Sequence, residues 1–220
     1  MNRLAALLFA VVAVPAQAED WPQFRGPTGQ GHSRAVGLPL EWSETRNVLW
    51  KTPVGGLGWS SPVVAGGRVW LTSVVETRGA RRDLVTASLR ALAFDVASGR
   101  EVVNVEVFRL DNPGEINTKN SRASPTPIVD GDRVYVHFGA EGTAALTTAG
   151  KILWATRLRY DSQHGSGGSP VLYRDVLIVN CDGWGDDAYV VAIDTNTGRT
   201  RWKTARRRPC LRCLRRRQRR

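Results

Sequence analysis

An internal repeat of about 50 residues constrains the fold of this chain more than any other feature. Three cognate tripeptides mark the repeat, Trp50-Lys51-Thr52, Trp154-Ala155-Thr156 and Trp202-Lys203-Thr204. A Gly-Arg or Gly-Lys pair begins four residues before positions 103, 154 and 202, although position 103 is Val rather than Trp. The equivalent positions 50, 103, 154 and 202 are therefore spaced by 53, 51 and 48 residues. A period of this length indicates an array of one supersecondary unit.

A second landmark in each unit indicates β-strands. A Ser/Thr-Pro dipeptide opens an apolar run, which passes through a two-residue turn into another apolar run. The three turns are Gly66-Gly67, Gly131-Asp132 and Arg174-Asp175. β-Branched runs split by such turns are typical of hairpins, and Pro at the head of a strand removes no ladder hydrogen bond. Each unit is predicted to hold four strands: one opened by the Trp position, one after the Pro, one after the turn, and one at 89–94, 143–147 or 189–193.

Four-stranded units of this length predict an all-β fold, a β-propeller in which each blade packs against its neighbours. We expect about three blades and the opening strand of a fourth. A β-sandwich with accidental spacing is the alternative, but three agreeing landmarks in each unit disfavour it. The Gly-His and Trp-Asp signature of WD blades is missing, whereas kelch blades have a similar period and are not separated by it.

The first 18 residues have the pattern of a secretory signal peptide. Arg3 supplies the positive start, residues 4–14 are apolar, and Ala16-Gln17-Ala18 forms a small-x-small cleavage site. Eleven apolar residues are too few to cross a bilayer, which needs about 20. Glu19 follows the predicted cut, so no lipid-attachment Cys is present. We expect a periplasmic or extracellular protein without a transmembrane segment.

The net charge of +11 is concentrated at the C-terminus. Residues 206–220 contain nine of the 31 Lys and Arg and no acid, which leaves 22 basic against 20 acidic residues elsewhere. A nearly neutral body argues against nucleic acid as a partner. The sequence therefore divides into a signal peptide (1–18), an N-terminal segment (19–47), partial propeller blades (48–205) and an Arg-rich tail (206–220).

The Arg-rich tail begins where a fourth unit should continue. We expect the chain to be the N-terminal part of a longer propeller, whose remaining blades complete the ring, and the tail to be disordered or the product of a frameshift. An arm for anionic surfaces and a zinc site through Cys210-x-x-Cys213 are the alternatives. A single Cys-x-x-Cys is a weak metal signal.

Several motifs, which follow one another along the chain, resemble one known family. Asp-x-x-x-Gly-Arg followed by Trp occurs at 194–202, and the others are Trp-Pro-Gln-Phe-Arg-Gly-Pro at 21–27, Gly-Trp-Ser-Ser-Pro-Val at 58–63, Asn-Ser-Arg-Ala-Ser-Pro-Thr-Pro at 120–127 and Asn-Cys-Asp-Gly at 180–183. Together they resemble the PQQ-like β-propeller proteins that carry the quinoprotein-type repeat, in particular secreted bacterial members. The resemblance implies a propeller of seven or eight blades, many of whose relatives are not enzymes.

The residues that quinone dehydrogenases of this family share are only partly matched. The resemblance implies an adjacent Cys pair, a Trp stacked on pyrroloquinoline quinone (PQQ), and Ca²⁺ bound by Glu, Asn and Asp. No two cysteines are adjacent in this chain. Trp59, Trp70 and Trp184 are candidates for stacking, although packing between blades is favoured for each. Asp182, Asp186 and Asp187 are weak candidates for Ca²⁺, since they lack the pattern of an EF-hand loop. PQQ and Ca²⁺ are thus implied by resemblance alone, and no cofactor is expected.

Polar loops are the best candidates for a ligand site, because binding residues concentrate on connections between strands. The candidate residues are Asn117, Lys119, Asn120, Arg122, His164 and Asp182. We predict a secreted, non-enzymatic binding or scaffold protein whose partner is a protein, a polysaccharide or a small molecule. The alternatives are a PQQ- and Ca²⁺-dependent oxidoreductase whose catalytic residues lie in further blades, and a factor for the assembly of outer-membrane proteins.

Overall fold

The computed structural model describes residues 19–79, 85–162, 164–183 and 187–206. These residues form twelve strands and, as their only helix, a single 3₁₀ turn. The elements are β1 (Val63–Ala65), β2 (Arg68–Arg78), β3 (Val85–Asp95), β4 (Glu101–Asp111), β5 (Ile128–Asp130), β6 (Arg133–His137), η1 (Gly139–Glu141), β7 (Thr143–Thr147), β8 (Ile152–Thr156), β9 (Val171–Tyr173), β10 (Val176–Cys181), β11 (Tyr189–Asp194) and β12 (Thr200–Ala205). Among the described residues no helix is long and apolar enough to span a membrane.

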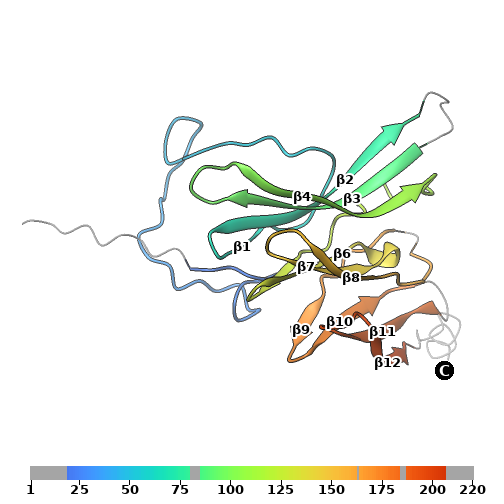
Figure 1. Cartoon of the computed structure of the whole chain (residues 1–220). Helices are drawn as coiled ribbons and strands as arrows, with labels where there is room; N and C mark the ends of the chain where they lie inside the picture. The colour runs from blue at the N-terminus through green and yellow to red at the C-terminus, as the bar shows by residue number, and fades with distance from the viewer. Residues whose placement is uncertain (1–18, 80–84, 163, 184–186, 207–220) are drawn as a thin grey trace, which may run out of the picture.

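The strands form three antiparallel sheets of four strands each, in the orders β1-β2-β3-β4, β5-β6-β7-β8 and β9-β10-β11-β12. We call them sheets 1, 2 and 3. Every sheet is a meander, so that neighbours in the chain are neighbours in space. The three sheets stand side by side like blades and do not close into a ring (Figure 1). The predicted class, an incomplete all-β propeller, is confirmed.

In the predicted division each four-stranded unit begins with the strand at the Trp position, but each sheet begins one strand later. The Trp position begins no sheet: Trp154 lies in β8 and Trp202 in β12, each the fourth strand of its sheet. β12 therefore completes sheet 3 and does not open a fourth blade. Trp50 lies outside the strands. A periodic pattern can be divided at any point of its period, and the sequence alone does not show which strand comes first.

Two apolar clusters lie between neighbouring sheets. The first joins sheets 1 and 2 and includes the fully buried Trp70, Leu89 and Val134. The second joins sheets 2 and 3 and includes Leu177 and Ile193. Alternate residues along each strand supply these faces, as the two-residue period of a strand requires. Each sheet is thus stabilised mainly by its neighbours, and burial of this apolar surface is the dominant favourable term in folding.

Two of the repeat Trp side chains, Trp50 and Trp154, each donate a hydrogen bond to a turn of a neighbouring sheet. Trp154 Nε1 donates to the carbonyl oxygen of Thr195 at 2.8 Å, and Thr156 Oγ1 donates to that of Gly198 at 2.6 Å. These acceptors belong to the turn between β11 and β12. Trp50 Nε1 and Thr52 Oγ1 make the same pair of bonds, both of 2.7 Å, to the turn between β3 and β4. The repeat in the sequence is therefore the signature of this contact between a Trp and a turn.

Asp194 holds the turn between β11 and β12 in shape. Its carboxylate accepts a 2.7 Å hydrogen bond from Arg201 Nε and a 2.8 Å bond from the backbone N–H of Thr197. Hydrogen bonds from Arg201 and Thr197 lower the pKa of Asp194 to about 2. The Asp194 carboxylate is therefore ionised at ordinary pH values, and its hydrogen bonds hold the turn that Trp154 contacts.

Gly198 lies directly against the ring of Trp154, and its replacement tests the contact between this Trp and the turn. Its φ of +69° is left-handed, and a Cβ placed there would lie 2.7 Å from the Trp154 ring. Gly131 is also left-handed, with φ of +57°, but a Cβ there would meet nothing within 4 Å. Both Gly→Ala changes incur the left-handed cost of about 1–2 kcal/mol. We expect Gly198→Ala to lower the free energy of unfolding by about 2 kcal/mol more than Gly131→Ala in urea titrations. Equal losses would show that the turn does not seat the ring.

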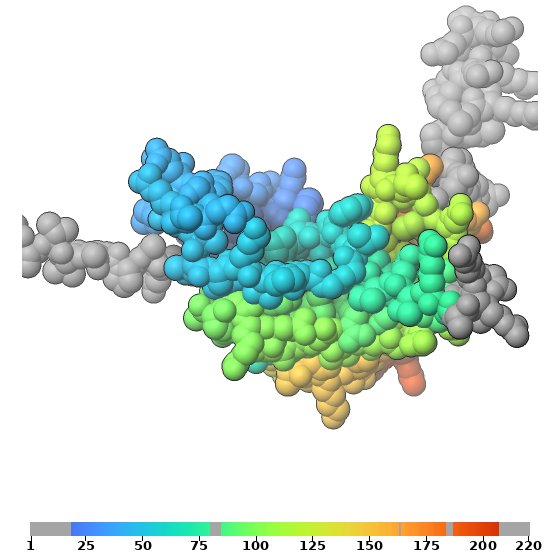
Figure 2. All heavy atoms as spheres, turned by 90° about the horizontal axis from the view of Figure 1, so that it is seen from above, coloured from blue at the N-terminus to red at the C-terminus, as the bar shows by residue number. Residues whose placement is uncertain are grey.

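The N-terminal segment ties sheets 1 and 2 together. Trp21 exchanges two backbone hydrogen bonds with Val64 of β1, at 2.6 and 2.9 Å. The next residue, Pro22, accepts a 2.8 Å bond from the N–H of Val129 in β5. Further along, the chain runs over the surface beside sheet 1, where Figure 2 shows it in blue. This stretch contributes no regular strand and leaves Leu40, Trp42 and Leu49 exposed.

Candidate functional site

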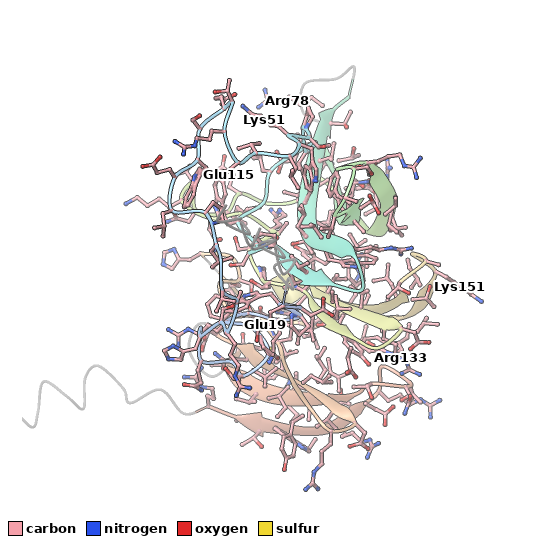
Figure 3. The ribbon with its side chains drawn as sticks, turned by 90° about the vertical axis from the view of Figure 1, so that its left-hand side faces the viewer. Glu19, Lys51, Arg78, Glu115, Arg133 and Lys151 are labelled. Atoms are coloured by element: carbon pink, nitrogen blue, oxygen red, sulfur yellow. The ribbon has the colours of Figure 1, made fainter. Side chains whose placement is uncertain are left out.

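The loops at one end of the sheets gather most of the polar candidates. Because each sheet is an antiparallel meander, the connections 112–127 and 157–170 leave the sheets at the same end as η1 and the link from β10 to β11. The opposite end holds the short hairpin turns and the Trp contacts. Figure 3 shows Arg133 at that opposite end, where Nη1 donates to Thr195 O at 3.0 Å and to Asn196 Oδ1 at 2.8 Å. The polar candidate loops and the Trp contacts between blades thus lie at opposite ends of the strands.

Three of the six predicted ligand residues meet between two loops. Asn120 Nδ2 donates to the carbonyl oxygen of His164 at 2.6 Å, and Asn117 Nδ2 lies 3.4 Å from His164 Nδ1. Gly165 accommodates this approach with φ of +78°, since a Cβ there would lie 2.9 Å from Asn120 Nδ2. We call Asn117, Asn120 and His164 the loop cluster. Asn120 and Asn117 lie 44 and 47 residues before His164 in the sequence. The packing of sheet 2 against its neighbours brings these residues together.

Arg122 lies beneath the loop cluster in an ion-pair network. Its Nη1 is 3.1 Å from Glu141 Oε1, and Nη2 donates to the carbonyl oxygen of Gly114. Glu141 also pairs with Arg157 at 3.6 Å, and the Arg157 guanidinium lies 5.1 Å from the centre of the Phe108 ring. Only 10% of the Arg122 side chain is exposed, and its Nε is buried without a hydrogen-bond partner among the described residues. Arg122 therefore organises the loop, and little of it is available to a ligand.

A small pocket separates Arg122 from the second loop. Its volume is about 50 Å³, and Arg122, Glu141, Ser162 and Ser166 line it together with the backbone of η1. This volume admits a water molecule but not a sugar or a quinone. The space thus suits a bridging water, which would satisfy the Arg122 Nε, rather than a bound substrate.

Lys119 and Asp182 are placed differently from the loop cluster. The Lys119 side chain is exposed, and its backbone N–H donates to Asn117 Oδ1 at 2.9 Å. Asp182 accepts a 2.6 Å hydrogen bond from Asn180 Nδ2 and pairs with Arg206. A guanidinium therefore neutralises the carboxylate that was a candidate for Ca²⁺.

Sequence reasoning missed a buried group of hydroxyl and thiol side chains below the second loop. The Tyr160 hydroxyl oxygen accepts a hydrogen bond from Ser166, its ring meets that of Tyr189 edge-on at 6.1 Å, and Cys181 is buried beside them. Burial raises the pKa of the Cys181 thiol to about 11 and raises the pKa of both tyrosines. Cys181 therefore stays a neutral thiol, which is unreactive as a nucleophile. Cys181 and Tyr189 are partners across β10 and β11, but Tyr160 and Ser166 come from the loop before sheet 3, and no sequence motif links the four residues.

The described residues do not fit the quinone and calcium set. Trp70 is 1% exposed between sheets 1 and 2, so its ring is not accessible to a quinone. Trp59 is 55% exposed, and no aromatic ring of the described residues lies against it. No three His, Cys, Asp or Glu side chains of the described chain gather as metal ligands would. Asp187 lies against Gly183, while Trp184 and Asp186 fall outside the described residues.

The chain was compared with curated proteins and with solved structures. No curated protein matches the chain. Among solved structures, europium-containing methanol dehydrogenase has 19% identity and a TM-score of 0.44, over 67% of this chain and 24% of that one. BamB from Moraxella catarrhalis has 14% identity and a TM-score of 0.40, over 71% of this chain and 51% of that one.

This chain spans less than two thirds of the length of either structure. A family model, PQQ_2, described as outer membrane protein assembly factor BamB, matches residues 36–207. That range contains all twelve strands and both loops of the candidate site. The chain therefore belongs to the PQQ_2 family of PQQ-like repeat propellers.

Proposed function

We propose that this chain forms part of a secreted, non-enzymatic propeller that binds a partner through the loop cluster. The observation that carries the proposal is the bond from Asn120 Nδ2 to His164 O, which joins the loops of two blades into one polar surface. Asn117 and His164 lie exposed, and their amide and imidazole groups both donate and accept hydrogen bonds. Asn120 bonds to His164, Ser121 and Ser124 and so holds the two loops together. Such groups suit the hydroxyls of a polysaccharide or the backbone of a peptide. Secretion rests on residues 1–18, which lie outside the described residues.

The support for this role is the rigidity of the surface. The Arg122–Glu141–Arg157 network holds the first loop against η1, and Gly165 lets the second loop approach Asn120. A ligand that contacts both loops would find them already positioned, which reduces the entropy cost of binding. Arg122, Glu141 and Arg157 are engaged in ion pairs with one another, in keeping with binding rather than with proton transfer.

The test is a binding measurement on the purified chain with soluble oligosaccharides and with extended peptides. Asn120→Ala is expected to weaken binding about fivefold, because a hydrogen bond between the loops contributes about 1 kcal/mol. Asn196→Ala, the same change at the opposite end of the sheets, is the control and should leave affinity unchanged. Absence of binding to both ligand classes, or an equal effect of the two changes, would contradict the proposal.

The rival oxidoreductase function is tested with the same protein. PQQ and Ca²⁺ are added together, and both quinone absorbance and reduction of a dye are followed. Binding of the quinone accompanied by dye reduction would replace the proposal by the enzymatic alternative. Neither signal is expected from this chain.

Assembly of outer-membrane proteins is the second candidate function. It is favoured by the description of the family model that matches residues 36–207. A bacterium that lacks its own assembly factor of this kind provides the test. If expression of the full chain restores normal levels of outer-membrane barrels, this function is supported; unchanged levels count against it.

A further inference from the structure

Two exposed apolar side chains, Leu57 and Trp59, adjoin the loop that holds Asn117 and Asn120. We call them the apolar step; their side chains are 58% and 55% exposed. Leu57 exchanges two backbone hydrogen bonds with Val74 of β2, at 2.9 and 2.8 Å. Val74 belongs to the apolar cluster between sheets 1 and 2. The apolar step therefore lies at the junction of two sheets that are both present, and its position does not depend on any further blade.

Three hydrogen bonds connect the apolar step to the loop cluster. The backbone N–H of Trp59 donates to the carbonyl oxygen of Ala123 at 3.1 Å, and Ser121 Oγ donates to the carbonyl oxygen of Leu57 at 3.5 Å. The N–H of Ser121 in turn donates to Asn120 Oδ1 at 2.8 Å. The apolar step and the loop cluster thus belong to one continuous surface.

Two glycines hold the apolar step close against β2. A Cβ at Gly56 would lie 2.3 Å from the carbonyl oxygen of Val74, and a Cβ at Gly58 would lie 2.5 Å from that of Thr72. Gly56 also has a left-handed φ of +85°. Larger residues at these two positions would push the segment away from the sheet. The apolar step is therefore exposed and yet fixed in place, as a preformed binding surface requires.

An exposed indole ring beside amide and imidazole groups matches the chemistry of a sugar. A pyranose ring has a face of C–H groups, which packs on an aromatic ring, and a rim of hydroxyls, which donate and accept hydrogen bonds. Trp59 offers the first kind of partner, and Asn117 and His164 offer the second. Asn117 Nδ2 and His164 Nδ1 lie 3.4 Å apart, so both can bond to neighbouring hydroxyls of one chain.

An extended peptide fits this surface less well. A peptide is commonly recognised by addition to the edge of a sheet or by side chains placed in pockets. The described residues of the two loops, 112–127 and 157–170, contain no strand. The pocket between these loops has a volume of about 50 Å³, which is too small for a large side chain. The N–H of Trp59 is already bonded within the chain, so the apolar step does not offer it to a peptide.

We propose that the apolar step and the loop cluster together bind a polysaccharide, with one pyranose ring stacked on Trp59 and neighbouring hydroxyls bonded to Asn117 and His164. This inference rests on the proposed function and selects one of its ligand classes. The polysaccharide lies along the open surface of the loops, because the small pocket beneath them admits no sugar. Several linked sugars are therefore needed to contact both the indole ring and the polar groups.

The test is titration calorimetry of the full chain with soluble α-1,4- and β-1,4-linked glucose oligosaccharides of one to six units. Affinity should rise with the length of the oligosaccharide. Trp59→Ala should weaken binding about 20-fold, because both the apolar contact and the stacking are lost. Trp59→Phe, which retains a ring, should stay within about threefold of wild type. Trp42→Ala changes a Trp that is 71% exposed in the N-terminal segment and should leave affinity unchanged.

Failure of this inference and failure of the proposed function give different results. If extended peptides bind and oligosaccharides do not, or if Trp59→Ala keeps full affinity while Asn120→Ala loses it, the inference is wrong and the binding surface stands. Equal losses in Trp59→Phe and Trp59→Leu would also overturn it, since a stacked ring is then not required. If neither ligand class binds, the proposed function is wrong as well. Far-UV circular dichroism verifies that each variant is folded.

Discussion

Replacing Trp154 by Ala is expected to lower the free energy of unfolding by about 4 kcal/mol, the usual range for a large buried aromatic. Trp154 is 9% exposed, its ring centre lies 6.3 Å from that of Tyr135, and Gly198 packs flat against it. Truncation leaves a cavity between sheets 2 and 3 and leaves the Thr195 carbonyl without its donor. Urea unfolding followed by far-UV circular dichroism measures the loss.

The control for this experiment is Trp202→Ala, which makes the same change at the equivalent position of sheet 3. Its ring is 44% exposed, so we expect a loss of about 1 kcal/mol or less at low protein concentration, where association is negligible. Similar losses of stability for Trp154→Ala and Trp202→Ala would mean that the Trp of the repeat stabilises its own sheet. Because Trp154 contacts a turn of sheet 3, we expect it to stabilise the contact between sheets, and its loss should be the larger.

The free energy of unfolding is expected to fall by about 3 kcal/mol when the pH is lowered from 6.5 to 4, because of His137. Burial lowers the pKa of this fully buried imidazole from 6.5 to about 4. Because the pKa in the folded chain is depressed, the unfolded chain takes up the proton first as the pH falls. The full stability is therefore present above pH 6.5 and is lost through this window, at about 1.4 kcal/mol per pH unit. Unfolding curves at several pH values measure the slope.

The variant that checks this assignment is His137→Asn, whose amide can still reach Thr143 Oγ1, the 2.8 Å partner of His137 Nδ1. The slope between pH 6.5 and pH 4.5 should flatten in this variant. His32→Asn, at an exposed position, should retain the slope. The lowered pKa of Asp194 acts in a separate window, below about pH 4, where its protonation removes stability from the turn at 194–198. A flat wild-type profile from pH 6.5 to pH 4.5 would contradict the role of His137.

The fold was predictable because its contacts are periodic in the sequence. The strands at 143–147 and 189–193 appear as expected, and the two-residue turns at 66–67, 131–132 and 174–175 separate paired strands. Trp-x-Thr recurs at 50–52 and 154–156, where the two side chains bond to a pair of carbonyl oxygens in the turn of a neighbouring sheet. The assignment of strands to sheets was not predictable, since a repeat specifies neighbours but not where one unit begins.

The candidate site was predictable only in part. Asn117, Asn120 and Arg122 lie within one loop, so that their proximity follows from chain connectivity. Their contact with His164 depends on how sheet 2 spaces the two loops, which no local pattern encodes. The buried Tyr160 and Cys181 group was missed for the same reason. The pairing of Asp182 with Arg206 was not predictable either, because it depends on where β12 ends.

The backbone hydrogen bonds of Trp21 and Pro22 join residues that lie far apart in the sequence, so we expect these bonds to form late in folding. Their partners, Val64 and Val129, lie 43 and 107 residues further along the chain. Residues that leave the ribosome first therefore cannot reach their final places until β5 has been made and has paired within sheet 2. Contacts of such sequence separation form slowly. The N-terminal segment therefore completes its contacts with both sheets only after β1 and β5 are available, and it links sheets 1 and 2 across the longest of these separations.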